Sequence, residues 1–227
     1  AAIGGDGTLN SVVQGIYKSE VIFITLPGGT LNHFTKDIGV VQDLDQALAN
    51  LSSSSPTRVD IALVNNRVFL NNSSLGIYPS SLLVRETVEE KLGKWPAAVV
   101  GVVRALVKFR LYTVTIEGET FRTPFIFIGN NNYHLDKGGQ RDSVTTGKLC
   151  AYAIRSPRRS TLVTLLFYAI FKKLRQAEEF IIHNDTQIDI ATKRTTVSVS
   201  ADGEVLRLSS PLHYTSVPGG LLVLGIL

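Results

Sequence analysis

Continuous apolar runs and helical patterns alternate along the first part of the chain. Residues Val21–Leu26 are apolar at nearly every position, which is typical of a parallel strand buried on both faces. The run ends in Pro27-Gly28-Gly29, and a short helical pattern follows. Asp43 and Gln46 have the spacing of a capping box and predict the start of another helix. We therefore interpret residues 1–57 as part of an α/β domain.

A different pattern begins after the polar stretch Ser52–Thr57, which we interpret as a hinge. Apolar and polar residues now alternate in short segments, as expected of strands with one face on a core. Two such strands flank an Asn65-Asn66 turn. Further strands are predicted at residues 112–118, 124–130, 149–154, 179–184, 187–192, 195–203 and 204–210, with helical patterns at 80–109 and 160–176 between them.

A long series of short strands separated by turn residues predicts an antiparallel β-sandwich. We place this domain at residues 58–215. Residues 216–227 form a C-terminal segment that could return to the first domain. The predicted fold is thus α/β plus β, with a partial α/β domain followed by a sandwich.

Composition describes an ordinary globular protein. Apolar residues make up 44% and charged residues 19% of the 227 residues, and the formal charge is +4. Lysine and arginine are mostly scattered, so no nucleic-acid partner is expected. The apolar run Thr161–Phe171 is too short to span a bilayer. The lone Cys150 allows no intrachain disulfide and favours a reducing, cytoplasmic compartment. The histidines lack the spacing of a zinc site.

The first candidate site is the glycine-rich loop Gly4-Gly5-Asp6-Gly7-Thr8. It lies between a strand end and a helix that begins near Leu9. Glycine lets a ligand approach the backbone closely, and the N–H groups and positive dipole end of a helix start suit a phosphate. Asp6 is negative, so we assign it to Mg²⁺ binding or to accepting a hydroxyl proton. The alternative is a tight turn with an N-capping aspartate.

A second glycine loop strengthens this interpretation. Pro27-Gly28-Gly29-Thr30-Leu31-Asn32 again follows a strand and precedes a helix. In both loops a threonine follows the glycines and an asparagine stands two residues later, as Asn10 and Asn32. Ligands of open α/β sheets bind beyond the carboxyl ends of the strands. We therefore expect both loops to face one crevice.

Taken together, four segments resemble the diacylglycerol kinase catalytic-domain family, which includes bacterial lipid kinases and sphingosine and ceramide kinases. They are GGDGTLN, PGGTLNHF, the segment VDIALVNNRVFLNNSSLG with Phe69 and Asn71, and ADGE at residues 201–204. The resemblance implies a two-domain enzyme that binds ATP between the domains and, with Mg²⁺, transfers the γ-phosphoryl group to a lipid hydroxyl. Since the strand before Gly4 has only three residues, we expect earlier parts of the nucleotide-binding domain to precede Ala1.

The resemblance also assigns individual residues. It implies that nucleotide is bound by Gly4, Gly5, Gly7, Thr8, Gly29, Thr30 and Asn32. It implies a role for Asp6 in metal or proton handling. It also implies that two carboxylates of the sandwich, those of Asp202 and Glu204, lie at the site of phosphoryl transfer. We expect Asp202 to be the general base, and Glu204 to support Mg²⁺ or the base. Without the resemblance, Asp202-Gly203 predicts only a hairpin turn.

Three positions depart from the family pattern. His33 stands where the family often has an acidic residue, and Ser11 where many members have glutamate. Thr146 stands where several bacterial members have an aspartate that helps to hold a structural Mg²⁺, so we doubt such a site here. These departures favour one alternative, a catalytically weak nucleotide- or lipid-binding module. A kinase of a soluble substrate such as NAD is a separate alternative.

The sequence leaves membrane contact and assembly open. Basic residues flank the apolar run Thr161–Phe171, so this helix could dock on the inner face of a membrane. The simpler interpretation is a helix packed on the sandwich, with basic side chains extended to solvent at its ends. The oligomeric state stays open, with a homodimer as one option.

Overall fold

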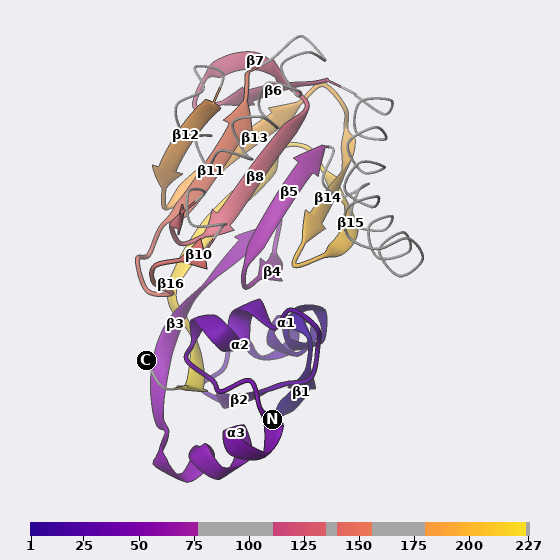
Figure 1. The fold of residues 1–227 in the computed structure, drawn as a ribbon. Coiled ribbons are helices and arrows are strands. Elements are labelled where there is room, and N and C mark those ends of the chain that lie inside the picture. Colours follow the sequence, from indigo (N-terminus) through magenta and orange to yellow (C-terminus); the bar gives the residue numbers. More distant parts are fainter. Residues whose placement is uncertain (77–110, 135–139, 156–179, 226–227) are drawn as a thin grey trace, which may run out of the picture.

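The computed structural model describes residues 1–76, 111–134, 140–155 and 180–225 (Figure 1). Both long helical patterns, including the candidate membrane-docking segment Thr161–Phe171, lie outside these residues. Within the described ranges, no helix is long and apolar enough to cross a membrane.

An α/β unit forms the N-terminal part of the structure. Its elements are β1 (Ala2–Gly4), α1 (Asp6–Ile16), β2 (Ile22–Pro27), α2 (His33–Asp37), α3 (Leu44–Asn50) and the 3₁₀ turn η1 (Leu51–Ser53). β1 pairs with β2 in parallel, so both strands deliver a glycine loop to the same edge. The predicted cap of α3 is present, because the backbone N–H of Gln46 donates to Oδ1 of Asp43 at 2.9 Å.

The sandwich follows, as the alternating pattern predicted. One described sheet has the order β12-β11-β8-β5-β14-β15 and is antiparallel throughout. Its strands are β5 (Asn72–Gly76), β8 (Phe125–Asn130), β11 (Leu149–Ile154), β12 (Phe180–Asp185), β14 (Thr196–Ala201) and β15 (Glu204–Ser209). A short ribbon pairs β9 (Tyr133–His134) with β10 (Gln140–Arg141).

The second large sheet joins both parts of the molecule. It has the order β1-β2-β16-β13-β6-β7, with β3 paired to β16 and β4 paired to β3. Its remaining strands are β3 (Ser55–Val64), β4 (Arg67–Phe69), β6 (Tyr112–Ile116), β7 (Glu119–Thr123), β13 (Gln187–Thr192) and β16 (Leu212–Gly225). Apolar side chains of both sheets meet in a core that includes Ile126, Val199 and Tyr214.

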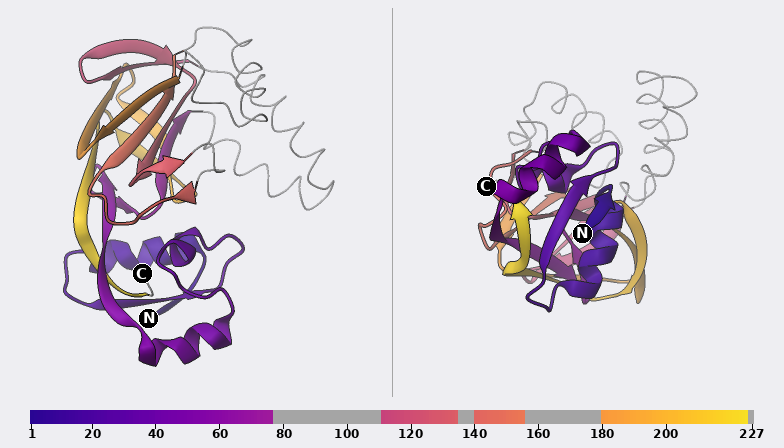
Figure 2. Two further views of the ribbon diagram at one scale, coloured as in Figure 1. Left: turned by 60° about the vertical axis from the view of Figure 1, so that its left-hand side comes forward. Right: turned by 90° about the horizontal axis from the view of Figure 1, so that it is seen from below.

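Two long strands, β3 and β16, connect the sandwich to the α/β unit (Figure 2). β16 pairs antiparallel with β13 near Leu212 and in parallel with β2 near Leu222. Its register against β3 shifts between Val217 and Leu221, where Pro218-Gly219-Gly220 interrupts the pairing. Because β3 and β16 run through the boundaries predicted at residues 57 and 215, the two parts share continuous strands rather than a flexible linker.

The predicted hairpin around Asn65-Asn66 is also present, with both residues at positive φ and Val64 paired to Arg67. The second strand of this hairpin is short, however. β4 ends at Phe69 and β5 begins at Asn72, so Leu70 and Asn71 connect strands of different sheets. The backbone N–H groups at this crossing are therefore available to the site described below.

Candidate functional site

The two glycine loops lie directly against each other. The N–H of Gly28 donates to the carbonyl of Gly4 at 3.2 Å. A Cβ atom on Gly28 would lie 2.8 Å from the nitrogen of Gly4, and one on Gly29 would lie 2.5 Å from Cα of Gly5. Any side chain at Gly28 or Gly29 would therefore force the loops apart. The structure brings the predicted glycines together, and their first physical role is this contact.

The start of α1 faces outward beside this contact. Gly5 is the N-cap, and no side chain caps the helix. Thr8 in the first turn is exposed. Since the first N–H groups of a helix have no partner within the helix, the loop presents donors and the positive end of the helix dipole.

The second loop is closed by its own asparagine. Asn32 adopts a left-handed conformation at the start of α2, with φ of 51°. Its Oδ1 accepts from the N–H of Gly29 at 2.9 Å, and only 8% of the residue is exposed. Asn32 therefore fixes the shape of the loop, while Thr30 beside it is exposed.

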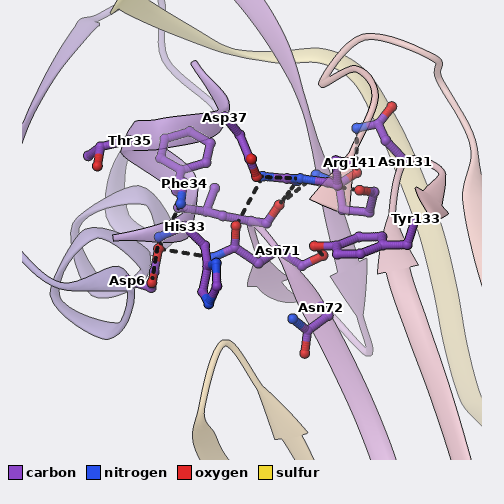
Figure 3. Close-up of polar contacts among 12 residues, drawn as sticks. Asp6, His33, Phe34, Thr35, Asp37, Asn71, Asn72, Asn131, Tyr133 and Arg141 are labelled. Atoms are coloured by element: carbon purple, nitrogen blue, oxygen red, sulfur yellow. Dashed lines mark hydrogen bonds and ion pairs between the residues drawn. The ribbon is translucent and has the colours of Figure 1, made fainter. Parts of the chain in front are cut away.

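Asp6 caps α2 rather than its own helix (Figure 3). Its Oδ2 accepts from the N–H of His33 at 3.1 Å, and its Oδ1 accepts from the N–H of Phe34 at 2.9 Å. Oδ1 also accepts from Nδ2 of Asn71 at 3.1 Å. This one carboxylate thus joins the first glycine loop, the start of α2 and the crossing between β4 and β5. A capping aspartate was one of the alternatives expected from the sequence, but the helix that it caps is a different one.

Asp202 occupies the tip of the β14–β15 hairpin and turns back toward the sandwich. Oδ1 accepts from the N–H groups of Asn71 at 2.8 Å and Asn72 at 3.1 Å. Oδ2 accepts from the N–H of Leu70 at 2.6 Å and from Nδ2 of Asn10 at 2.7 Å. Burial raises the pKa of the Asp202 carboxyl, and the four N–H donors act against that rise.

These four hydrogen bonds hold the hairpin tip in place. They connect it to α1 and to the crossing between the sheets. Asp202 and Gly203 have φ of 45° and 89°, as a tight two-residue hairpin turn requires. The hairpin expected from Asp202-Gly203 is therefore present, and its carboxylate has a donor for each of its acceptor positions.

Glu204 follows in the same hairpin and is exposed. A Cβ atom on Gly7 would lie 3.8 Å from its Oε1, so the carboxylate lies beside the first glycine loop. Asp202 therefore faces the interior of the protein and Glu204 the start of α1. The hairpin therefore places a carboxylate of the sandwich beside the first glycine loop.

Arg141 is a residue of the candidate site to which the sequence analysis assigned no role. Its Nε donates to Oδ2 of Asp37 at 2.7 Å, Nη1 to the carbonyl of Leu70 at 2.7 Å and Nη2 to Oδ1 of Asn71 at 3.0 Å. Only 1% of the side chain is exposed, and the guanidinium lies 5.7 Å from the centre of the Tyr133 ring. An arginine in a polar loop segment is usually solvated, so no local signal marks this one.

The charge of Arg141 is kept by its neighbours. Burial by itself would lower the pKa of the guanidinium, but Tyr133 and the Asp37 carboxylate raise it above its usual value. Burial also raises the pKa of Tyr133, whose hydroxyl donates to the carbonyl of Asn71 at 2.9 Å. Asn71 therefore contacts Asp6, Arg141 and Tyr133, which Figure 3 shows around it. Its backbone N–H also donates to Asp202.

The three departures from the family pattern have distinct surroundings. His33 is exposed, and in Figure 3 its ring lies between Asp6 and Asn72. The hydroxyl of Ser11 donates to the carbonyl of Gly7 at 3.1 Å, within α1. The N–H and hydroxyl of Thr146 both donate to Oδ1 of Asn131, at 2.7 and 2.6 Å. Across the described ranges, no group of three or more His, Cys, Asp or Glu side chains could hold a metal ion.

The sequence of this chain is similar to those of known proteins. The family model "Diacylglycerol kinase catalytic domain" matches residues 1–64. A "Putative lipid kinase" of Staphylococcus aureus (strain MRSA252) is 26% identical over 244 residues, covering 99% of this chain and 76% of the relative. The resemblance to the diacylglycerol kinase catalytic-domain family is confirmed. A second "Putative lipid kinase" of S. aureus (strain MW2) is 25% identical over the same coverage.

The fold is shared with solved structures of this family. "A putative diacylglycerol kinase from Bacillus anthracis str. Sterne" has a TM-score of 0.75 and 23% identity, covering 99% of this chain and 76% of that one. Another structure of a putative diacylglycerol kinase from the same organism has a TM-score of 0.74 and 22% identity. The α/β part followed by a β-sandwich, as predicted from the sequence, is the fold of these proteins.

Proposed function

We propose that this protein is an ATP-dependent lipid kinase that transfers the γ-phosphoryl group to a lipid hydroxyl. The observation that carries the proposal is the position of Glu204. A carboxylate of the sandwich lies beside Gly7, at the glycine loop that starts α1. Phosphoryl transfer requires a nucleotide site and a proton acceptor at one point. The names of the relatives support a lipid as the acceptor.

The nucleotide phosphates would bind at the start of α1. Because no side chain caps this helix, its first N–H groups can donate to a phosphate. Gly4, Gly5 and Gly7 leave the backbone accessible, and the exposed hydroxyls of Thr8 and Thr30 can donate at the rim. The roles of Gly29 and Asn32 are indirect, because they hold the second loop in its shape.

The residues present fit Mg²⁺ as a companion of the nucleotide. This ion is usually held by one or two carboxylates together with substrate phosphates and water, so a cage of three protein ligands is not needed. Asp6 would hold it, because Oδ2 of Asp6 accepts one hydrogen bond, from His33. When bound, the ion neutralises charge on the phosphates.

We assign the general base to Glu204 and a positioning role to Asp202, which exchanges the roles expected from the sequence. To accept a proton from the acceptor hydroxyl, Asp202 would have to lose one of its four hydrogen bonds. Glu204 is exposed and next to the glycine loop. A lipid alcohol is a poor nucleophile at neutral pH, so a carboxylate that takes its proton contributes to the rate.

The decisive experiment is transfer of radiolabel from γ-labelled ATP by the intact protein. The acceptors are diacylglycerol, ceramide and sphingosine in mixed micelles with Mg²⁺, and NAD serves as the soluble comparison. We expect label in a lipid phosphate and none in NADP. Label in NADP alone would identify a kinase of a soluble substrate, and ATP binding without transfer would identify a binding module. Since the proposed acceptor is a membrane lipid, we place the reaction at the inner face of the membrane.

A further inference from the structure

The guanidinium of Arg141 is surrounded by acceptors of the protein itself. Nε donates to Oδ2 of Asp37 at 2.7 Å, and Nη2 donates to Oδ1 of Asn71 at 3.0 Å. Nη1 donates to the carbonyls of Leu70 at 2.7 Å and Asn130 at 3.3 Å. Because 1% of the side chain is exposed, this cation holds groups of the protein rather than a phosphate of a substrate.

The hydrogen bond from Arg141 sets the direction of the Asn71 amide (Figure 3). A guanidinium has donors and no acceptor, so the amide oxygen of Asn71 has to face it. The NH₂ group then points to the other side, where it donates to Oδ1 of Asp6 at 3.1 Å. Since Asn71 is 3% exposed, protein groups rather than bulk water determine this orientation.

The Asn71 amide in turn orients the Asp6 carboxylate. Oδ1 of Asp6 accepts from this amide and from the N–H of Phe34, at 3.1 and 2.9 Å. Oδ2 accepts from the N–H of His33 at 3.1 Å. Within the part of the chain that the structure describes, Oδ2 is therefore the oxygen with more free acceptor capacity. Rotation of the carboxylate would exchange the two oxygens, and the bond from Asn71 opposes it.

Arg141 has a second route to the site, through the backbone. The carbonyl of Leu70 accepts from Arg141, and the N–H of the same peptide group, that of Asn71, donates to Oδ1 of Asp202 at 2.8 Å. This carbonyl also accepts from Nδ2 of Asn130 at 2.9 Å. It therefore keeps a buried partner when Arg141 is changed. Among the described residues, the Asn71 amide oxygen has its donor in Arg141, so the side-chain route is the more sensitive one.

We propose that Arg141 is a positioning residue of the phosphoryl-transfer site and sets the Asp6 carboxylate through the side-chain amide of Asn71. This inference rests on the proposed function and adds a residue to its site. Arg141 touches no substrate in this role. It keeps the charge of Asp6 in one place before the reaction begins, which is how charged groups lower a barrier most effectively. Misplacement of such a group by about 1 Å can cost about 10²-fold in rate.

The first test is a double-mutant cycle of Arg141→Lys and Asp6→Asn in the label-transfer assay. Lysine keeps the positive charge but lacks the planar fork that contacts several acceptors at once. We expect Arg141→Lys alone to lower kcat about 10-fold or more. In the Asp6→Asn background it should change kcat by less than about 2-fold, because the two residues then act as one unit. Losses that multiply would show action by the backbone route, and the inference is then wrong. Wild-type kcat in Arg141→Lys would contradict it as well.

Hydrogen exchange of the unliganded protein separates this inference from the proposed function, because it needs neither nucleotide nor lipid. The reporters are the N–H groups of His33 and Phe34, which donate to Asp6. We expect both to exchange about 10-fold faster in Arg141→Lys, the scale of one weakened hydrogen bond to a charged group. The N–H of Gln46 at the cap of α3 is the internal reference and should exchange as in the wild type.

Asp37→Asn is the matched control for hydrogen exchange. It weakens the attachment of α2 and leaves the hydrogen bond between Arg141 and Asn71 in place. Equal acceleration in Asp37→Asn and Arg141→Lys would mean that Arg141 anchors α2 and does not act through Asn71, against the inference. Asn71→Asp is the second variant, because it keeps an acceptor for Arg141 and removes the NH₂ group that donates to Asp6.

Asn71→Asp should accelerate exchange of the same two N–H groups. Unchanged exchange in either Asn71→Asp or Arg141→Lys overturns the inference. Suppose instead that both variants accelerate exchange while the wild type transfers no label to any lipid. The positioning of Asp6 by Arg141 then stands although the kinase proposal fails.

Discussion

The guanidinium of Arg141 donates to the carboxylate of Asp37, with Nε and Oδ2 2.7 Å apart. Asp37 is the last residue of α2, and Asp6 caps the first residues of the same helix. The short helix that follows the second glycine loop is therefore held at both ends. One attachment comes from the first glycine loop and the other from the sandwich. This arrangement fixes the distance between the two parts of the candidate site.

Replacing Arg141 by alanine should reduce the free energy of unfolding by about 3–5 kcal/mol, because Asp37 and the carbonyl of Leu70 lose a buried partner. Urea denaturation measures the loss. The control is Arg58→Ala, which breaks the ion pair with Glu20, where the side chains are 51% and 80% exposed. That change should cost less than about 1 kcal/mol. Equal losses in the two variants would contradict the role assigned to Arg141.

Asp6→Asn should affect both activity and stability. The amide of asparagine can accept hydrogen bonds at its oxygen but not at its NH₂ group. The cap of α2 therefore weakens, and about 1 kcal/mol of stability is lost. We also expect kcat to fall about 10²-fold or more, because a charge at the transfer site is removed. Asp43→Ala is the matched control, since Asp43 caps α3 by accepting from Gln46.

The control should lose similar stability in thermal unfolding and retain kcat. If Asp6→Asn retains wild-type turnover, Asp6 is only a capping residue.

Glu204→Gln and Asp202→Asn should separate chemistry from positioning. Glu204 is exposed, so its variant should fold normally while kcat falls about 10²- to 10⁴-fold, the range of a lost general base. Asp202→Asn places an NH₂ group against N–H donors and should cost about 1–3 kcal/mol of stability. Steady-state kinetics and urea denaturation of both variants provide the comparison. A normal rate in Glu204→Gln would return the base to Asp202.

Gly29→Ala should weaken ATP binding without unfolding the sandwich. Its Cβ would lie 2.5 Å from Cα of Gly5, so the two loops must separate. Calorimetric titration with ATP and Mg²⁺ should show an affinity loss of about 10-fold or more, a change of about 1.4 kcal/mol. Gly15→Ala is the control within α1, because nothing lies within 4 Å of its added Cβ. It should bind ATP normally and gain about 0.5–1 kcal/mol of helix stability. Unchanged affinity in Gly29→Ala would show that loop contact is not needed for the nucleotide.

Local chemistry was sufficient to predict the individual elements. The apolar run Val21–Leu26 gives β2, and the cap of Asp43 begins α3. Asn65-Asn66 and Asp202-Gly203 form hairpin turns because asparagine, aspartate and glycine tolerate positive φ. Each of these outcomes depends on residues within a few positions of one another, so the sequence alone determines them.

The directions of the functional side chains were decided only in the tertiary structure. Asp6 finds its donors 27, 28 and 65 positions away, and Asp202 finds donors up to 192 positions away. Arg141 pairs with Asp37 across 104 positions. A carboxylate side chain can face solvent, a ligand or a buried N–H group. Which of these it faces depends on the hydrogen-bond donors that the fold places near it. The sequence by itself therefore determined that Asp6 lies in a glycine loop and that Asp202 and Glu204 belong to a hairpin. The packing of β4, β5 and α2 decided that this hairpin meets the glycine loops and which of the three carboxylates stays exposed.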